Sequence, residues 1–145
     1  GGAVRGVLGP LLDEQPASVV VANRTVARAE ALARLFGREH SGIELSACGF
    51  EQVEGPFDLV INGTSASLKG DLPAITADVI GADTVVYDMM YSLQTTTFNQ
   101  WALDHGAVHV FDGLGMLVEQ AAEAFFVWRG VRPETSAVIE ELRTD

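Results

Sequence analysis

The feature that most constrains the fold is a series of short apolar runs that alternate with helix-forming segments. The runs are rich in β-branched and aromatic residues, as buried strands are, and they occupy residues 18–23 (SVVVAN), 57–62 (FDLVIN) and 84–89 (TVVYDM), with weaker runs at 43–47 and 107–111. Apolar residues at helical spacing predict helices over 3–14, 25–36, 97–105, 114–130 and 133–143, the first one poor or kinked because it contains Gly6, Gly9 and Pro10. This alternation predicts an α/β fold in which a parallel sheet carries helices on both faces.

Length and charge restrict the classes of partner. The 145 residues suit one domain, 1–145, and 48% of them are hydrophobic, which excludes a disordered chain. The net charge of −11 disfavours nucleic acid and anionic membrane surfaces as partners. No apolar run reaches the roughly 18 residues of a membrane span. The single cysteine, Cys48, excludes an internal disulfide, so we expect a cytoplasmic protein.

A glycine pair and two arginines indicate a phosphate site. In dinucleotide-binding folds the residue that ends the second strand follows the glycine turn by about 20 residues, and an arginine there accommodates a 2′-phosphate. Arg24 stands at that distance from Gly2. Arg28 falls in the first turn of the next helix, for which Thr25 is a good N-cap residue, although a cation there opposes the helix dipole. We favour a shared phosphate site over two solvated arginines.

The long helix at 114–130 carries two lines of residues. Leu114, Leu117, Ala121, Phe125 and Trp128 form an apolar stripe that predicts ordinary core. Gly113, Met116, Gln120 and Ala124 form a second line of smaller residues. Gln120 is its only hydrogen-bonding side chain, so it either faces solvent or belongs to a site. Asp112 precedes the helix and is expected to cap it.

Five motifs then make a resemblance specific. GGAVRGVLGPLL, NRTVARAEALARLF, FDLVINGTSASLKGDLP, VYDMMY and DGLGMLVEQAAEAFFVWRG occur in the order and close to the spacing of the shikimate dehydrogenase family. The chain resembles the carboxyl-terminal NADP-binding domain of that family, including closing helices at 112–130 and 133–143. The resemblance implies a Rossmann-like, doubly wound parallel sheet that lacks its first strand.

The resemblance also implies a cofactor site for NADP. Gly1, Gly2 and Ala3 match the end of the family's pyrophosphate-binding glycine turn, where backbone N–H groups at a helix N-terminus face phosphates. The 2′-phosphate clamp is matched by Asn23, Arg24, Thr25 and Arg28. The turn beside the cofactor is matched by Asn62, Thr64 and Ser65, and the nicotinamide end by Met89 and Gly113. A plain polar turn at Thr64 and Ser65 is the alternative interpretation.

Two further residues match substrate contacts in the family. Tyr91 matches a tyrosine that meets the substrate carboxylate, and Gln120 a glutamine that hydrogen-bonds a substrate hydroxyl. Without the motif, Tyr91 would be interpreted as a half-buried aromatic residue after a strand. The implied small-molecule substrate, shikimate or 3-dehydroshikimate, is shared with an amino-terminal substrate domain.

The departures from the family pattern are equally informative. The family's proton chemistry belongs to a Lys–Asp pair in the amino-terminal domain, which these residues do not include, so we expect no catalytic residue here and no turnover by these residues alone. The only lysine, Lys69, matches a position without that role. No metal-ligand cluster is evident. Thr96-Thr97 replaces the family's Thr-Pro, which puts the helix start at 97 in question.

Three functional hypotheses remain open after this comparison. The first is the NADP-binding part of a shikimate dehydrogenase, which exchanges a hydride between NADPH and the C3 carbonyl of 3-dehydroshikimate. The second is a related dehydrogenase for quinate or an aminoshikimate-type compound, with Arg24 arguing against strict use of NAD. The third is a non-catalytic nucleotide-binding module. The oligomeric state does not follow from the sequence.

Overall fold

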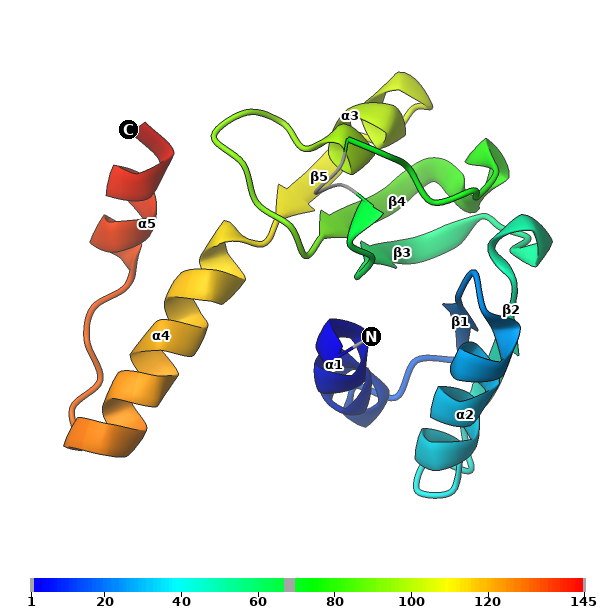
Figure 1. Ribbon diagram of the computed structural model, residues 1–145, viewed down its shortest axis with the longest axis horizontal. Helices are drawn as coiled ribbons and strands as arrows, with labels where there is room; N and C mark the ends of the chain where they lie inside the picture. The colour runs from blue at the N-terminus through cyan, green and yellow to red at the C-terminus, as the bar shows by residue number, and fades with distance from the viewer. Residues whose placement is uncertain (1, 67–69, 145) are drawn as a thin grey trace.

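The computed structural model describes residues 2–66 and 70–144, and it has the α/β architecture predicted from the sequence (Figure 1). The strands are β1 (Ser18–Ala22), β2 (Glu44–Cys48), β3 (Phe57–Asn62), β4 (Ile80–Asp88) and β5 (His109–Asp112). The helices are α1 (Gly2–Asp13), α2 (Val26–Gly37), α3 (Thr97–Asp104), α4 (Leu114–Arg129) and α5 (Ser136–Thr144), with short 3-10 turns at Phe50–Gln52 and Ala77–Val79. The predicted elements are present, with ends moved by a few residues, and α1 is continuous despite Pro10.

The strands form two parallel sheets, a two-stranded one in the order β1-β2 and a three-stranded one in the order β3-β4-β5. The predicted parallel α/β fold is therefore confirmed, as a partial fold whose described strands form two separate sheets. Within the described residues, β1 pairs only with β2 and β3 only with β4, so each has an open edge. The break falls where the sequence predicted that a strand is lacking.

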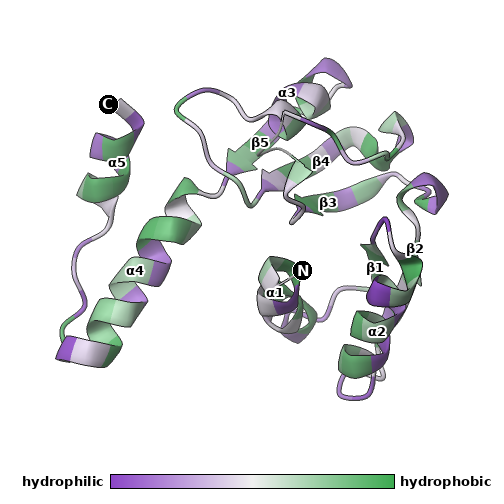
Figure 2. Cartoon of the chain, viewed as in Figure 1, coloured by the Kyte–Doolittle hydropathy of each residue, from purple (hydrophilic) through white to green (hydrophobic). Residues whose placement is uncertain are grey.

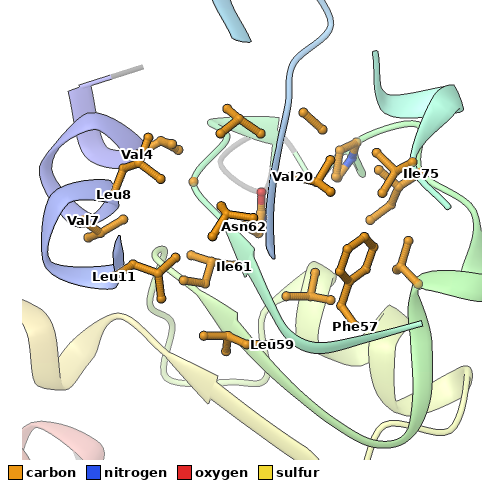
Figure 3. A pocket seen from close by; sticks show the side chains of 18 of the residues that line it. Val4, Val7, Leu8, Leu11, Val20, Phe57, Leu59, Ile61, Asn62 and Ile75 are labelled. Atoms are coloured by element: carbon orange, nitrogen blue, oxygen red, sulfur yellow. The ribbon is translucent and has the colours of Figure 1, made fainter. Parts of the chain in front are cut away.

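An apolar cavity of about 500 Å³ lies between these open edges. Figure 3 shows side chains of α1, β1 and β3 pointing into the same space, among them Leu11, Val20 and Ile61. Because these side chains come from both sheets, the cavity separates two small cores. One comprises Leu8, Leu12, Val21 and Ala29, and the other comprises Val86, Phe98, Ala102 and Ala107.

The start of α3 is well defined, which resolves the question that the missing proline raised. Thr96 occupies the N-cap position, and its hydroxyl accepts a hydrogen bond from the backbone N–H of Asn99 at 3.2 Å. Thr25 also occupies an N-cap position, that of α2, but its side chain makes no capping hydrogen bond. The side chain of Asn23 accepts from the N–H of Thr25 instead, at 2.9 Å.

The predicted core stripe of α4 is wrong. Of its five residues only Leu114 is buried, and the buried face continues instead through Val118 and Ala122. Phe125 is 46% exposed and Trp128 80% exposed. The reason is the direction of α4, which leaves the end of β5 and extends away from the sheet, so that its hydrophobic segments lie far from either core (Figures 1 and 2). Helical spacing identified an apolar face but not whether the described residues cover it.

His40 joins the end of α1 to the end of α2. Its Nδ1 lies 3.0 Å from the carbonyl oxygen of Phe36, and its Nε2 lies 3.2 Å from Oδ1 of Asp13. The hydrogen bond to the Phe36 carbonyl raises the pKa of His40 above 6.5, and the contact with the Asp13 carboxylate raises it further. A raised pKa in the folded state means that protonated His40 stabilises the fold.

We therefore expect a pH titration of His40, followed by NMR, to give a pKa above 6.5. The stabilisation is complete below the pKa of the unfolded chain and is lost as the pH rises through the folded pKa. The Asp13→Asn variant keeps the shape of the contact and removes the charge, so its His40 should have a lower pKa. An unchanged pKa in this variant would show that the contact with Asp13 does not act on His40.

Candidate cofactor site

The site predicted from the sequence lies where β3, β4 and β5 end. The three strands are in register, with Asn62 opposite Asp88 and Asp88 opposite Asp112. Since the strands are parallel, the loops that follow them leave the sheet at one edge, and ligands of open parallel sheets bind at this carboxyl edge. The predicted residues Asn62, Met89 and Gly113 thus lie at the ends of these strands or directly after them.

A buried polar network organises the first two loops. Asn62 is 3% exposed and Asp88 is fully buried, and Nδ2 of Asn62 donates to Oδ1 of Asp88 at 3.1 Å. The same carboxylate oxygen accepts from the N–H of Met90 at 3.2 Å. Oδ1 of Asn62 accepts from Oγ1 and N–H of Thr64, at 2.8 and 3.1 Å. Asn62 and Asp88 therefore hold the two loops in place from the interior.

Sequence reasoning gave Asp88 no role, although it is the centre of this network. The available signal was a carboxylate at the end of a buried strand, directly before Met89. A buried carboxylate needs hydrogen-bond donors around it, and those donors come from the loops that would line a site.

Glycines allow these loops to approach one another closely. A Cβ on Gly113 would lie 2.2 Å from the carbonyl oxygen of Met89, and its N–H donates to the carbonyl of Met90 at 2.9 Å. A Cβ on Gly63 would lie 2.4 Å from Cγ2 of Val4 and 3.2 Å from Sδ of Met89. The structure therefore brings the predicted residues Met89 and Gly113 together, with Gly63, which was not predicted, between Met89 and the first turn of α1.

The glycine turn is described only in part, because Gly1 lies outside the described residues. Gly2 and Ala3 form the first turn of α1, and a Cβ on Gly2 would meet nothing within 4 Å. Free N–H groups at a helix N-terminus favour an anion. The contact between Val4 and Gly63 places this end of α1 beside the loop after β3.

The two arginines stand at the end of β1, on the other sheet. Arg24 and Arg28 are both exposed, and within residues 2–66 and 70–144 neither forms an ion pair. In a chain of net charge −11, two neighbouring cations without carboxylate partners form a local positive site. Asn23 and Thr25 support it by fixing the turn through their hydrogen bond. This arrangement fits a phosphate group.

The two predicted substrate residues come from different elements. Tyr91 follows β4 and is 50% exposed, and Gln120 is exposed on the second turn of α4. Ser65 is also exposed, whereas the hydroxyl of Thr64 is engaged with Asn62. Tyr91 lies two residues after Met89, and Gln120 lies seven residues after Gly113 along α4.

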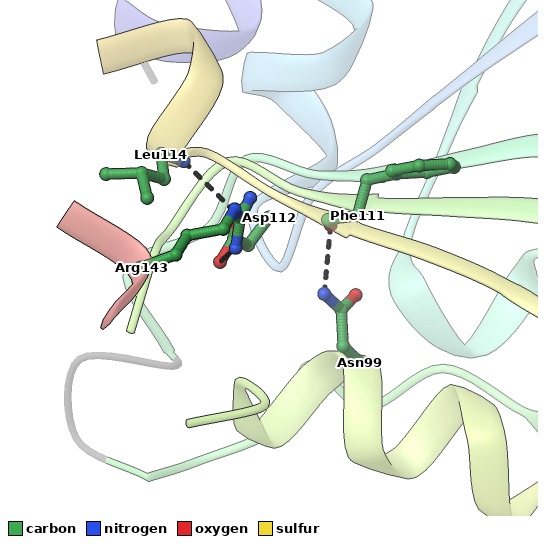
Figure 4. Close-up of polar contacts among 5 residues, drawn as sticks. All are labelled: Asn99, Phe111, Asp112, Leu114 and Arg143. Atoms are coloured by element: carbon green, nitrogen blue, oxygen red, sulfur yellow. Dashed lines mark hydrogen bonds and ion pairs between the residues drawn. The ribbon is translucent and has the colours of Figure 1, made fainter. Parts of the chain in front are cut away.

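Asp112 forms a contact that the sequence did not predict. Its carboxylate accepts two hydrogen bonds from Arg143 of α5, with Nη2–Oδ1 at 2.8 Å and Nη1–Oδ2 at 3.3 Å (Figure 4). Oδ1 also accepts from the N–H of Leu114, the first residue of α4, at 3.2 Å, although Gly113 rather than Asp112 occupies the N-cap position. Burial, and secondarily the Asp112 charge, raises the pKa of Tyr87 on the adjacent strand. In the same figure Asn99 donates to the carbonyl of Phe111 at 2.9 Å and thereby joins α3 to β5.

In the part of the chain that the structure describes, no group of three or more His, Cys, Asp or Glu residues is placed to hold a metal ion. None of the described helices is long and apolar enough to cross a membrane. Lys69, the only lysine, lies outside the described residues.

Comparisons with known proteins agree with this arrangement. Residues 113–143 match the family model described as the shikimate 5′-dehydrogenase C-terminal domain. Over its whole length the chain is 98% identical to a protein of Marinobacter nauticus named shikimate dehydrogenase (NADP(+)), of which it covers 53%. The chain thus spans about half the length of the curated relatives that it matches.

Solved structures of dehydrogenases are also similar to this chain. Shikimate 5-dehydrogenase of Thermus thermophilus, in complex with NADP(H) and shikimate, superposes with a TM-score of 0.79 at 31% identity, over 99% of this chain and 52% of that one. Quinate dehydrogenase of Corynebacterium glutamicum, in complex with NAD, superposes with a TM-score of 0.77 at 25% identity, over 100% and 52%.

The parallel α/β arrangement is that of a Rossmann-like fold, seen here as a partial fold. The chain belongs to the shikimate dehydrogenase family, and it corresponds to the carboxyl-terminal part of that family's proteins.

Proposed function

We propose that the chain is the NADP-binding part of an NADP-dependent shikimate dehydrogenase, which reversibly reduces 3-dehydroshikimate to shikimate in the cytoplasm. The observation that carries the proposal is the 98% identity, over all 145 residues, to a relative whose name states both the substrate and the cofactor. The local geometry supports the proposal, because a helix N-terminus and an arginine pair suit phosphate groups, and Gly113 lets two loops approach closely beside Met89.

The described residues fit NADP by their chemistry. Arg24 and Arg28, supported by Asn23 and Thr25, would hold the 2′-phosphate, because bidentate guanidinium groups match phosphate oxygens. Gly2 and Ala3, following Gly1, would present backbone N–H groups to the pyrophosphate. The arginine pair thereby selects NADP over NAD.

Other residues shape the nicotinamide end. Met89 and Gly113 would border the nicotinamide, since only glycine allows the backbone at 113 to lie against the Met89 carbonyl. Thr64 and Ser65 would line the neighbouring turn, which Asn62 holds from the interior. Bound there, the cofactor supplies the hydride, while these residues orient it and exclude water.

The substrate would be held from the same edge. Tyr91 would donate its hydroxyl to the substrate carboxylate and Gln120 would hydrogen-bond a substrate hydroxyl. The proton in the reaction would be moved by the Lys–Asp pair of the family's other domain, so we propose no catalytic residue in this chain.

An enzymatic assay tests the proposal on a complete protein. The chain is joined to the remaining half of the Marinobacter nauticus relative, and this completed protein is given shikimate with NADP+ or NAD+. We expect NADPH formation with shikimate and NADP+, much slower reaction with NAD+, and slower turnover of quinate. Turnover of quinate but not shikimate would support the related dehydrogenase, and binding of NADP+ without any turnover would support a non-catalytic module.

A further inference from the structure

The carboxyl-terminal segment, residues 130–144, runs back along α4 and contacts Asp112, directly before the start of this helix. α5 lies alongside α4 (Figure 1), and three polar contacts join residues 132–143 to α4 and to the end of β5. Arg132 pairs with Glu123 near the far end of α4, and Oγ1 of Thr135 donates to Glu119 at 2.6 Å in the middle. Arg143 reaches Asp112 at the base. The segment therefore acts as a strut between the tip of α4 and the sheet.

The contact at the base differs from the one near the tip. Arg132 and Glu123 are both about half exposed, and exposed ion pairs contribute little to stability. The Asp112 side chain is only 11% exposed, and its carboxylate receives two guanidinium hydrogen bonds and the first N–H of α4. Two parallel hydrogen bonds between guanidinium and carboxylate also fix an orientation, so this pair constrains direction as well as distance.

That constraint acts on the nicotinamide side of the proposed site. Asp112 is followed directly by Gly113, which packs against the carbonyl of Met89 and donates to that of Met90. Gln120 lies farther along α4, beyond the same junction. Among the described residues only Leu114, Val118 and Ala122 of α4 are buried, so within this part of the protein the junction and the strut are the contacts that fix its direction.

We propose that Arg143 is a positioning residue of the dehydrogenase: through Asp112 it sets the angle at which α4 leaves the sheet. That angle aligns Gln120 with the Met89–Gly113 contact, and hence the substrate with the nicotinamide. The inference rests on the proposed function, because it assigns Gln120 to the substrate and Met89 and Gly113 to the cofactor. Arg143 touches neither ligand and acts only through Asp112.

The test compares Arg143→Ala and Arg143→Lys with Arg132→Ala in the completed protein. Small misplacements of reacting groups reduce rates strongly, so Arg143→Ala should lower kcat about tenfold and raise the KM for shikimate, with the Kd for NADP+ changed by less than about twofold. Arg143→Lys keeps the charge but not the paired hydrogen bonds, so it should recover only part of kcat. Arg132→Ala, which removes the exposed pair of the same strut, should leave all three constants near those of the parent.

A second readout does not depend on the reaction. Amide hydrogen exchange at residues 113–118 should become faster in Arg143→Ala than in Arg132→Ala. If Arg143→Ala does not fold, Arg143→Lys and Thr135→Val should show a smaller effect of the same kind: a lower kcat and a higher KM for shikimate, with the Kd for NADP+ unchanged. Equal kinetics and equal exchange in the Arg143 and Arg132 variants would overturn the inference. An inactive parent protein would overturn the proposed function, while the exchange result would still decide the role of Arg143 at the junction.

Discussion

Replacing Gly113 by alanine is expected to lower the free energy of unfolding by about 2–3 kcal/mol and to remove most of the activity of the completed protein. The added Cβ would lie 2.2 Å from the carbonyl oxygen and 2.7 Å from the carbonyl carbon of Met89. Both are backbone atoms, which cannot rotate away, so the loops after β4 and β5 must separate. Their separation breaks the hydrogen bond from Gly113 to Met90 and widens the nicotinamide end of the site. Urea denaturation and steady-state kinetics measure the two effects.

Gly115→Ala is the matched control for this prediction. Gly115 lies two residues farther along, within α4, and a Cβ there would meet nothing within 4 Å. Alanine favours a helix over glycine by roughly 0.5–1 kcal/mol, so this variant should be as stable as the parent or slightly more so. If Gly113→Ala behaved in the same way, the close contact with Met89 would not constrain the site.

Replacing Arg24 by alanine is expected to weaken NADP+ binding by about 1.5–3 kcal/mol, the contribution of a hydrogen bond to a charged group. This corresponds to roughly 10- to 150-fold in Kd, and NAD+, which has no 2′-phosphate, should bind almost unchanged. Titration calorimetry on the completed protein measures both constants. Arg24 is exposed and forms no ion pair among the described residues, so replacing it does not leave a carboxylate there without its partner.

Arg34→Ala serves as the control for charge. Arg34 is exposed on α2, the helix that follows Arg24, and it pairs with Glu30. Its removal lowers the positive charge equally but should change the Kd for NADP+ by less than about twofold. Equal effects of the two substitutions would indicate a general electrostatic field, and no effect of Arg24→Ala would contradict the assignment of the 2′-phosphate site.

Strand positions were predictable from the sequence because buried parallel strands need short apolar β-branched runs. β1 and β3 are such runs, and their ends place Arg24 and Asn62 on the carboxyl edge. The break between the two sheets followed from the family resemblance and not from the runs themselves, since an apolar run does not show how many neighbours a strand has.

Contacts between residues far apart in the sequence were harder to predict. The approach of Gly113 to Met89 and the pairing of Arg143 with Asp112 join residues far apart in sequence, and no local pattern encodes either distance. The apolar stripe of α4 was recognised by spacing, yet spacing does not reveal that Phe125 and Trp128 are exposed in the described residues. Asp88 was missed because a single carboxylate at a strand end carries no periodic signal.

The most direct test of the central claim is a crystal structure of the completed protein with NADP+ bound. We expect the 2′-phosphate between Arg24 and Arg28, the pyrophosphate at the N-terminus of α1, and the nicotinamide beside Met89 and Gly113. A cofactor bound away from the carboxyl edge of the strands, or a 2′-phosphate out of reach of both arginines, would contradict the account.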